Sequence, residues 1–365
     1  MTEQISRRYV PAQFARDKAR LFLVGEAPGE DETIEGRPFV GAAGHLLNNV
    51  LRALDIDREE CHITNVFKIR PPQNQIEFFF EGVREAKKSG LSSENNRPPL
   101  YSGIGYLKEQ YLTYLEELRN EIIKVSPPLI VAMGNTAMWA LTEMTGAKNL
   151  RGHIVDCTLV KGPKVIMSYH PAAVLRQWEF KPLLFSDLQK ALLYKEGVEV
   201  KREIIIEPSI TDLENFYEEH IKPIKGTGIP LTFDIETGSD TILCVGFAVG
   251  GFALVVPFTS GKLNNPSYWE TADKEKMALD WVKGVLEDPT IAKLGHNVLY
   301  DIQWLKAKFG ICTAQPIHDT MVMFHSLQPE MRKGLNELVS MYTFAPPWKT
   351  WVSHGTKASI NKQNA

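Results

Sequence analysis

The chain has 365 residues, of which 44% are hydrophobic and 23% are charged, and its formal net charge is −3. This length and composition are typical of two globular domains with cores of ordinary size. A negative net charge excludes a protein that binds nucleic acid through its overall field, so any contact with DNA must come from local patches.

The four cysteines are isolated from one another, at Cys61, Cys157, Cys244 and Cys312. No two of them form the CxxC pair that is typical of zinc or cluster sites, and isolated thiols suit a reducing cytoplasm. The N-terminal twenty residues hold no apolar run, and no stretch approaches the roughly 18 apolar residues of a membrane helix. We therefore expect a cytoplasmic protein that has no contact with a membrane.

Short apolar strands alternate with helical patterns through the first half of the chain. Strands are expected at 20–25, 62–67, 129–133 and 165–171, and helices at 42–54, 108–125, 134–144 and 181–195. The alternation predicts an α/β domain of three layers with a largely parallel sheet. The polar stretch 71–105 is typical of an insertion or a long loop. Its aromatic residues, Phe78–Phe80 and Tyr101, are expected either to pack on the core or to stack on exposed bases.

A domain boundary is expected near 197–209, where charges cluster and Pro208 begins a new pattern. The two domains would then cover 1–203 and 204–365. In the second domain strands come first and helices follow. The expected strands are 230–238, a hairpin at 242–257 and 291–296, and the expected helices are 211–220, 273–286, 298–309, 321–327 and 335–342. This order predicts a mixed-sheet α/β domain.

Polar residues follow three of the strands in the first domain, within the segments 25–47, 63–72 and 170–176. Each segment alone is explained equally well as a surface loop. Because the carboxyl ends of parallel strands form the ligand crevice of such a sheet, we expect the three segments to converge there. Together they predict one functional site.

The motifs GEAPGE, GRPFVG, TNV-K-RPP and HPAA-LR, in this order, resemble those of the family-four and related uracil-DNA glycosylases. The resemblance covers roughly residues 20–195. It implies that a flipped uracil stacks on Phe39 and that Asn65 reads the edge of the uracil. It also implies that His170 supports the leaving group and that Glu26 lies where the water is held.

These residue types suit the chemistry that the resemblance implies. An enzyme that acts on a base takes it out of the stack and contacts its face and its Watson–Crick edge. An amide donates to O4 and accepts from N3–H, an imidazole near O2 stabilises the uracil anion, and a carboxylate orients water toward C1′. Leu175 is expected as an apolar wedge in the minor groove, with Arg176 beside it. Lys68 and Arg70 are expected either to contact phosphate or to be ordinary surface cations.

The chain departs from the family-four pattern at its cysteines. Those enzymes typically carry four cysteines that bind an iron–sulfur cluster, but Ile69 stands at the position of one of them and no cysteine precedes Cys61. We therefore expect no iron–sulfur cluster. The domain is expected either to excise uracil or to be a non-catalytic module that binds or senses uracil in template DNA.

A second constellation consists of three carboxylates and an amide. The segment FDIETG places Asp234 and Glu236 two residues apart, on one side of a strand, and GHNVLYD places Asn297 and Asp301 four apart, on one face of a helix. The alternative for Asp234 and Glu236 is a pair of solvent-exposed side chains on an edge strand, with no role in metal binding. Carboxylates are hard ligands, so Asp234, Glu236 and Asp301 are predicted to bind Mg²⁺ or Mn²⁺ for the hydrolysis of a phosphodiester.

The motifs DIET, HN-LYD and HDTM resemble the 3′→5′ proofreading exonuclease domain of family-A DNA polymerases, over about residues 228–345. The resemblance implies an RNase-H-like fold, a substrate contact at Asn297 and a mainly structural role for Asp319, with metal binding as the alternative for Asp319. The third motif of that family has no match after Tyr342, so we expect an incomplete exonuclease domain or a fragment of a longer polymerase. The expected context is a bacteriophage DNA polymerase in the host cytoplasm. Its expected partners are single-stranded or primer–template DNA, a polymerase domain and other replication proteins.

Overall fold

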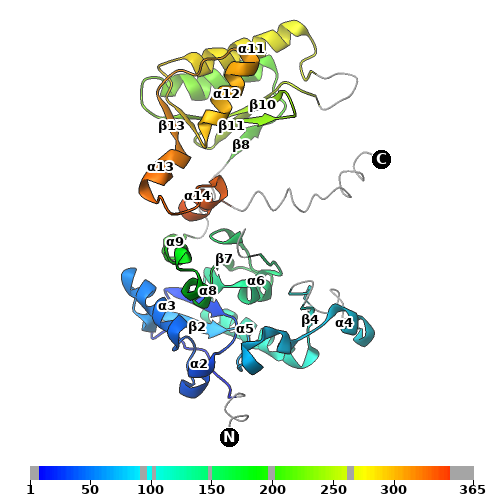
Figure 1. Cartoon of the computed structure of the whole chain (residues 1–365), viewed down its shortest axis with the longest axis vertical. Helices are drawn as coiled ribbons and strands as arrows, with labels where there is room; N and C mark the ends of the chain where they lie inside the picture. Colours follow the sequence, from blue (N-terminus) through cyan, green and yellow to red (C-terminus); the bar gives the residue numbers. More distant parts are fainter. Residues whose placement is uncertain are drawn as a thin grey trace. The chain divides into compact units, whose positions relative to one another are not determined.

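The computed structural model describes residues 8–90, 97–100, 104–146, 150–195, 202–260 and 267–345. These residues form two compact units (Figure 1). The first unit contains the described residues up to 195 together with 336–345, and the second contains 202–335. Among the described helices, none combines the length and the apolar character needed to span a membrane.

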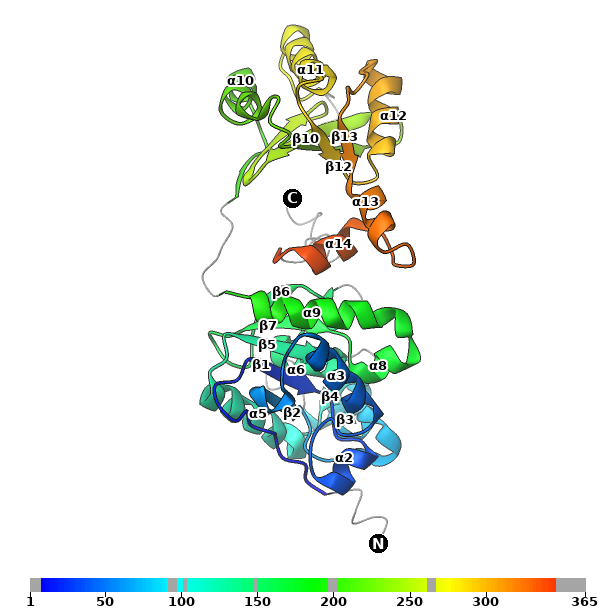
Figure 2. The ribbon, with the colours of Figure 1, turned by 90° about the vertical axis from the view of Figure 1, so that its left-hand side faces the viewer.

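The first unit is built on a five-stranded sheet in the order β2-β1-β5-β7-β6 (Figure 2). Its strands are β1 (Leu21–Gly25), β2 (Cys61–Asn65), β5 (Leu129–Met133), β6 (Ile154–Asp156) and β7 (Lys164–Ser168). The first three and β7 run parallel, and only β6 pairs antiparallel, with β7. The predicted largely parallel sheet is therefore confirmed.

Two apolar cores cover the two faces of this sheet. Alternate residues of β5 enter them, with Ile130 and Ala132 in one core and Val131 and Met133 in the other. The first core is closed by α5 (Leu112–Val125) and α6 (Asn135–Thr142), and the second by α3 (Ala42–Ala53) and α9 (Lys181–Leu193). Helices on both faces give the three layers that the sequence predicts.

The stretch expected to be an insertion adds to the first core instead of forming a free loop. Phe79 is fully buried and its ring stacks on Phe67, with 3.8 Å between the ring centroids. The core alternative is therefore confirmed for Phe79 and Phe80, whereas Tyr101 lies outside the described residues. The smaller elements of the unit are α2 (Glu30–Glu35), β3 (Phe80–Glu81), α4 (Val83–Ser89), β4 (Tyr106–Leu107) and α8 (Pro171–Arg176).

The second unit holds a six-stranded mixed sheet in the order β13-β12-β9-β10-β11-β8. Its elements are β8 (Glu203–Ile205), α10 (Ile210–Phe216), β9 (Leu231–Thr237), β10 (Ile242–Val249), β11 (Phe252–Pro257), α11 (Ala272–Glu287), β12 (Lys293–Gly295), α12 (Val298–Phe309), β13 (Ile317–Asp319) and α13 (Thr320–Leu327). Strands β9, β10 and β11 form an antiparallel meander, and β12 and β13 run parallel to β9. This topology confirms the expected RNase-H-like mixed sheet.

Helix α14 (Leu335–Tyr342) forms at the predicted position, but from Asn336 onward it belongs to the first unit. The reason is a buried polar cluster. Arg151 donates to the Ser340 hydroxyl, and Lys190 donates to the Ser340 carbonyl oxygen at 2.8 Å. Buried cations need acceptors, and Ser340 supplies two. For residues 336–345 the structure thus differs from the expected second domain of 204–365.

Candidate functional sites

The carboxyl ends of the parallel strands bring the first predicted site together. Gly25 and Asn65 are paired at the ends of β1 and β2. A Cβ atom added to Gly134, which follows β5, would lie 3.2 Å from the Cβ of His170, which follows β7. The segments that the sequence places at strand ends therefore converge at one edge of the sheet.

Gly25 lies between an aromatic ring and an amide. A Cβ atom at this position would lie 2.3 Å from Oδ1 of Asn65 and 2.5 Å from Cζ of Phe39, so only glycine fits. The Phe39 ring is also close to the imidazole of His170, with 5.4 Å between the centroids and 33° between the planes. The ring, the amide and the imidazole are thus gathered within one small volume.

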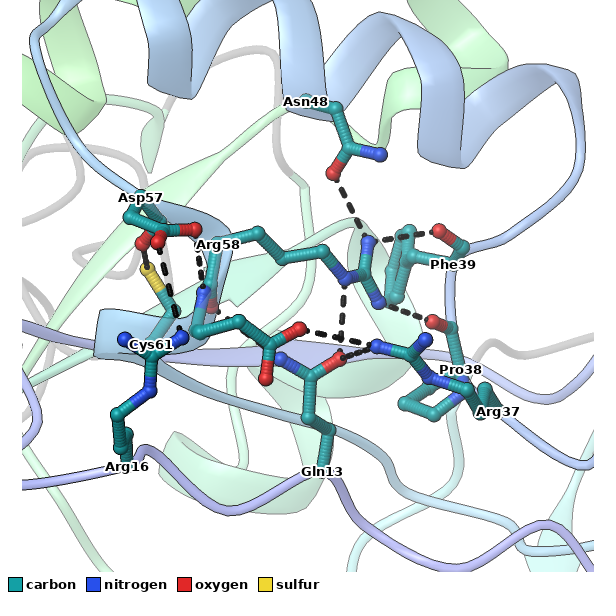
Figure 3. Close-up of polar contacts among 10 residues, drawn as sticks. Gln13, Arg16, Arg37, Pro38, Phe39, Asn48, Asp57, Arg58 and Cys61 are labelled. Atoms are coloured by element: carbon teal, nitrogen blue, oxygen red, sulfur yellow. Dashed lines mark hydrogen bonds and ion pairs between the residues drawn. The ribbon is translucent and has the colours of Figure 1, made fainter.

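Phe39 is held in a strained backbone conformation by Arg58, which the sequence analysis did not select. The φ angle of Phe39 is +53°, in the left-handed region. The Arg58 guanidinium donates to the carbonyl oxygens of Phe39 at 2.8 Å and Pro38 at 2.5 Å, and to Oδ1 of Asn48 (Figure 3). Such strain persists only where the surroundings enforce it, so Arg58 is a positioning residue for the Phe39 ring.

Asn65 carries an unused acceptor. The residue is 4% exposed, and within the described residues its buried Oδ1 has no hydrogen-bond partner. A buried polar atom without a partner costs free energy in a finished fold. The amide is therefore arranged for a ligand that brings a hydrogen-bond donor.

Lys68 does not contact phosphate, because its side chain is fully buried. Its ammonium donates to the Thr64 hydroxyl at 2.5 Å, to the Asn65 carbonyl oxygen at 2.9 Å and to Oε1 of Glu121 at 2.7 Å. Burial lowers the pKa of Lys68, and the Glu121 carboxylate opposes that shift. Both alternatives from the sequence, a phosphate contact and a surface cation, are wrong for this residue, which instead fixes the main chain at Asn65.

His170 begins helix α8 and is held as a neutral ring. Its Nδ1 accepts from the Ala172 N–H at 3.1 Å, which leaves the proton of the neutral imidazole on Nε2. Burial, with a smaller contribution from the charge of Arg176, lowers the pKa of His170 to about 4. At neutral pH the ring therefore offers one N–H donor and carries no charge.

This low pKa predicts how stability depends on pH. The unfolded chain, in which the pKa of His170 returns to 6.5, binds more protons than the folded chain between pH 4 and 6.5. The contribution of His170 to stability is therefore fully present above pH 6.5 and is lost as the pH falls toward 4. Urea denaturation measures the free energy of unfolding of wild type and His170→Gln across this window, and the difference between the two proteins should change with pH. A difference that stays constant with pH would contradict a pKa of about 4 for His170.

Glu26 is paired with a residue that the sequence analysis missed. The hydroxyl of Thr136, at the start of α6, donates to Oε2 of Glu26 at 2.5 Å. Burial raises the pKa of Glu26, while this bond and the charge of Arg176 lower it. A signal for Thr136 exists, because Gly134 and Asn135 follow a buried strand of the same sheet, as the three selected segments do.

The remaining predicted contacts of the first domain lie at the surface. Leu175, on α8, is 45% exposed, and Arg176 beside it is exposed. Arg70 is partly exposed and donates to Oδ1 of Asn74 at 2.8 Å and to Oε2 of Glu30 at 3.2 Å. These positions are compatible with DNA contacts, which stay predictions for Leu175, Arg176 and Arg70.

In the second unit Asp234 and Glu236 lie on the exposed side of β9, whose other side faces the core. Asp301, on α12, is 3% exposed, and its Oδ1 accepts from the Ile235 N–H at 2.9 Å. Burial, with a contribution from the charge of Asp234, raises the pKa of Asp301 to about 6, and burial followed by the charge of Glu236 raises that of Asp234. The carboxylate of Asp234 is therefore close enough to interact with those of Asp301 and Glu236.

Hard carboxylate donors that repel one another fit a divalent cation in their chemistry. Within the described residues, however, no three His, Cys, Asp or Glu side chains are gathered closely enough to hold a metal ion by themselves. One oxygen of Asp301 is also occupied by the β9 main chain. The predicted three-carboxylate ligand set is thus present in composition but is not preassembled.

Asp319 has the structural role that the sequence predicts. Its carboxylate accepts from the N–H groups of Asn297 and Val298 at the start of α12, both at 3.0 Å, and from that of Met321 at 2.8 Å. Asn297 is exposed and left-handed, with φ +60°. Asp319 therefore holds the helix end on which Asn297 is presented.

The cysteines do not fit an iron–sulfur cluster, which takes about four thiolate ligands. Of the four, only Cys61 and Cys157 fall in the first unit, and both are buried as free thiols. Burial raises the pKa of Cys61 to about 12 and also raises that of Cys157, which disfavours the thiolate that would bind iron.

Comparison with known proteins also divides the chain near residue 200, but the exonuclease match includes residues 336–345, which the structure assigns to the first unit. Residues 11–193 match the uracil DNA glycosylase superfamily, and residues 208–350 match the 3′-5′ exonuclease family. The type-4 uracil-DNA glycosylase of Archaeoglobus fulgidus is 34% identical over 188 residues, which cover 50% of this chain and 79% of that protein. The type-4 uracil-DNA glycosylase of Thermotoga maritima is 34% identical over 184 residues, which cover 49% of this chain and 80% of that protein.

A DNA polymerase of Bacillus phage SP01 is 23% identical over 336 residues, which cover 84% of this chain and 32% of the polymerase. Among solved structures, Escherichia coli RNase D, an exoribonuclease involved in structured RNA processing, is 17% identical with a TM-score of 0.29, covering 40% of this chain and 34% of that one. The two matched regions thus belong to families of DNA-processing proteins. The chain belongs to the uracil DNA glycosylase superfamily and joins a domain of that superfamily to a 3′-5′ exonuclease domain.

Proposed function

We propose that the first unit excises uracil from DNA by hydrolysing the N-glycosidic bond. The observation that carries the proposal is the buried, unpartnered Oδ1 of Asn65, which lies close to the Phe39 ring on the side of Gly25 where a Cβ atom would stand. A flipped uracil that stacks on the Phe39 ring would bring its N3–H to Oδ1 of Asn65. Cytosine has no proton on N3, so it would leave two acceptors facing each other and would be rejected.

The other two side chains act on the bond that breaks. His170 donates its Nε2–H to O2 of the uracil, where negative charge develops as the electron pair of the C1′–N1 bond leaves with the base. Glu26 orients a water toward C1′ and accepts its proton. Thr136 holds the carboxylate in place through its bond to Oε2.

We infer that the second unit removes nucleotides from the 3′ end of DNA. Asp234, Glu236 and Asp301 would hold Mg²⁺ or Mn²⁺, which when bound supplies an activated hydroxide and stabilises the leaving oxygen. Asn297, exposed at the start of α12, would contact the substrate strand. The similarity to the phage polymerase over 84% of the chain supports a role within DNA replication, with template or primer DNA as the partner.

One assay tests both activities. A labelled single-stranded oligonucleotide with one deoxyuridine is incubated with the full chain, with either Mg²⁺ or EDTA. Alkali-labile cleavage at the uracil should appear in both conditions, whereas shortening from the 3′ end should require the metal.

Two variants serve as controls for each other in this assay. Asn65→Ala should lose only the excision, and Asp234→Asn only the shortening. Excision that needs the metal, or one variant that abolishes both products, contradicts the proposal. If neither product appears but uracil-DNA binds more tightly than thymine-DNA, the first unit is a binding module.

A further inference from the structure

A tryptophan next to helix α8 is exposed at the surface of the first unit. Trp178 is 58% exposed, whereas the other tryptophans in the described residues are buried or partly buried. It follows α8 by two residues, close to Leu175, which is 45% exposed. Leu175 and Trp178 thus place two large apolar side chains at the surface, three positions apart.

The segment that carries the indole is fixed to the site. Phe180, in the same short turn as Trp178, stacks on Tyr169 with 4.1 Å between the ring centroids and 10° between the planes. Tyr169 directly precedes His170. Helix α8 also packs against the turn and against α9, beside which it lies in Figure 2. Packing on both sides therefore fixes the main chain that carries Trp178 relative to His170.

The charges around the indole fit a polyanion. The ammonium of Lys181 lies 4.6 Å from the centre of the Trp178 ring. Arg176 is exposed, and its charge lowers the pKa of both His170 and Glu26, so it lies near the site. Within 171–181 the only acidic residue is Glu179. Aromatic rings interleaved with cations are the features with which proteins bind a single nucleic-acid strand.

We propose that Trp178 stacks on the base next to the extruded nucleotide and thereby binds the DNA strand beside the uracil. The proposal rests on the proposed excision of uracil. Leu175, which lies closer to His170 in the chain, would fill the gap that the flipped nucleotide leaves, and the indole would cover the neighbouring base. Every base offers a π-face, so the contact tolerates any sequence but needs a neighbour that is not stacked in a duplex. It therefore favours single-stranded substrate.

The test is a double-mutant cycle that combines a substitution in the protein with removal of a base from the DNA. The substrate is a single-stranded oligonucleotide in which an abasic analogue replaces, one at a time, the two nucleotides on each side of the uracil. Substrate binding is obtained from the dependence of single-turnover excision on protein concentration. For wild type, one abasic position should weaken substrate binding by roughly 5- to 100-fold. In Trp178→Ala the intact DNA should bind about as weakly, and the abasic position should have no further effect. Trp178→Phe should retain most of the binding.

Phe14 supplies a matched control, because it is 43% exposed in the same unit and has the Lys124 ammonium 4.3 Å from its ring centre. Phe14→Ala should leave both measurements unchanged. Additive losses from Trp178→Ala and the abasic position would overturn the proposal. If wild type does not excise uracil, the same cycle is measured as binding by fluorescence anisotropy, so failure of the proposed activity is distinguished from failure of the stacking contact.

Discussion

Replacing His170 with alanine is expected to slow uracil excision by a factor of about 10²–10³, the usual cost of removing one positioned donor to a developing anion. The imidazole is neutral, since its pKa is about 4, and its Nε2–H is free to donate because Nδ1 accepts from Ala172. The rate constant at saturating DNA should therefore fall, with little change in substrate affinity. Single-turnover kinetics on the deoxyuridine oligonucleotide measures both quantities.

His170→Gln provides the conservative comparison, because its amide also carries an N–H donor. It should recover part of the rate that His170→Ala loses. The 3′-end shortening by the second unit reports in the same sample that each variant is folded and active elsewhere. An unchanged excision rate in His170→Ala would show that another group supports the leaving uracil.

The convergence of the first site follows from a rule that can be applied to the sequence. Glu26, Asn65 and His170 lie at the carboxyl ends of buried strands, and parallel strands place such residues at one edge. Thr136 obeys the same rule and could have been selected. Arg58 could not, because its role comes from bonds to carbonyl oxygens 19 and 20 positions away. Local sequence patterns do not predict a hydrogen bond between a side chain and a main-chain atom so far away in the chain.

Lys68 and α14 illustrate a second limit of sequence reasoning. A lysine three residues after a strand is typical of a surface position, and the charge that offsets its burial comes from Glu121, 53 positions later on α5. Helix α14 was correctly predicted as a helix, but its place in the first unit depends on Arg151 and Lys190, far earlier in the chain. Element positions follow from local periodicity, whereas partners of buried charges depend on the tertiary fold.

Lys68→Met is expected to lower the free energy of unfolding by about 3–5 kcal/mol, because it leaves the Glu121 carboxylate buried without its cation. The Lys68 side chain is fully buried, that of Glu121 is 12% exposed, and Nζ of Lys68 lies 2.7 Å from Oε1 of Glu121. Urea denaturation followed by far-UV circular dichroism measures the change. As a control, Arg20→Met removes an exposed pair with Glu60 at 3.0 Å and should cost no more than about 1 kcal/mol.

The double variant Lys68→Met, Glu121→Leu separates stability from positioning. It removes both buried charges, so most of the lost stability should return. The Asn65 carbonyl oxygen would still lack the donor that Lys68 supplies at 2.9 Å, and the amide that we propose to read uracil would be less well fixed. Excision should therefore stay slower than in wild type and discriminate less against cytosine. Full recovery of both the excision rate and the discrimination against cytosine would show that Lys68 only balances the charge of Glu121 and does not position Asn65.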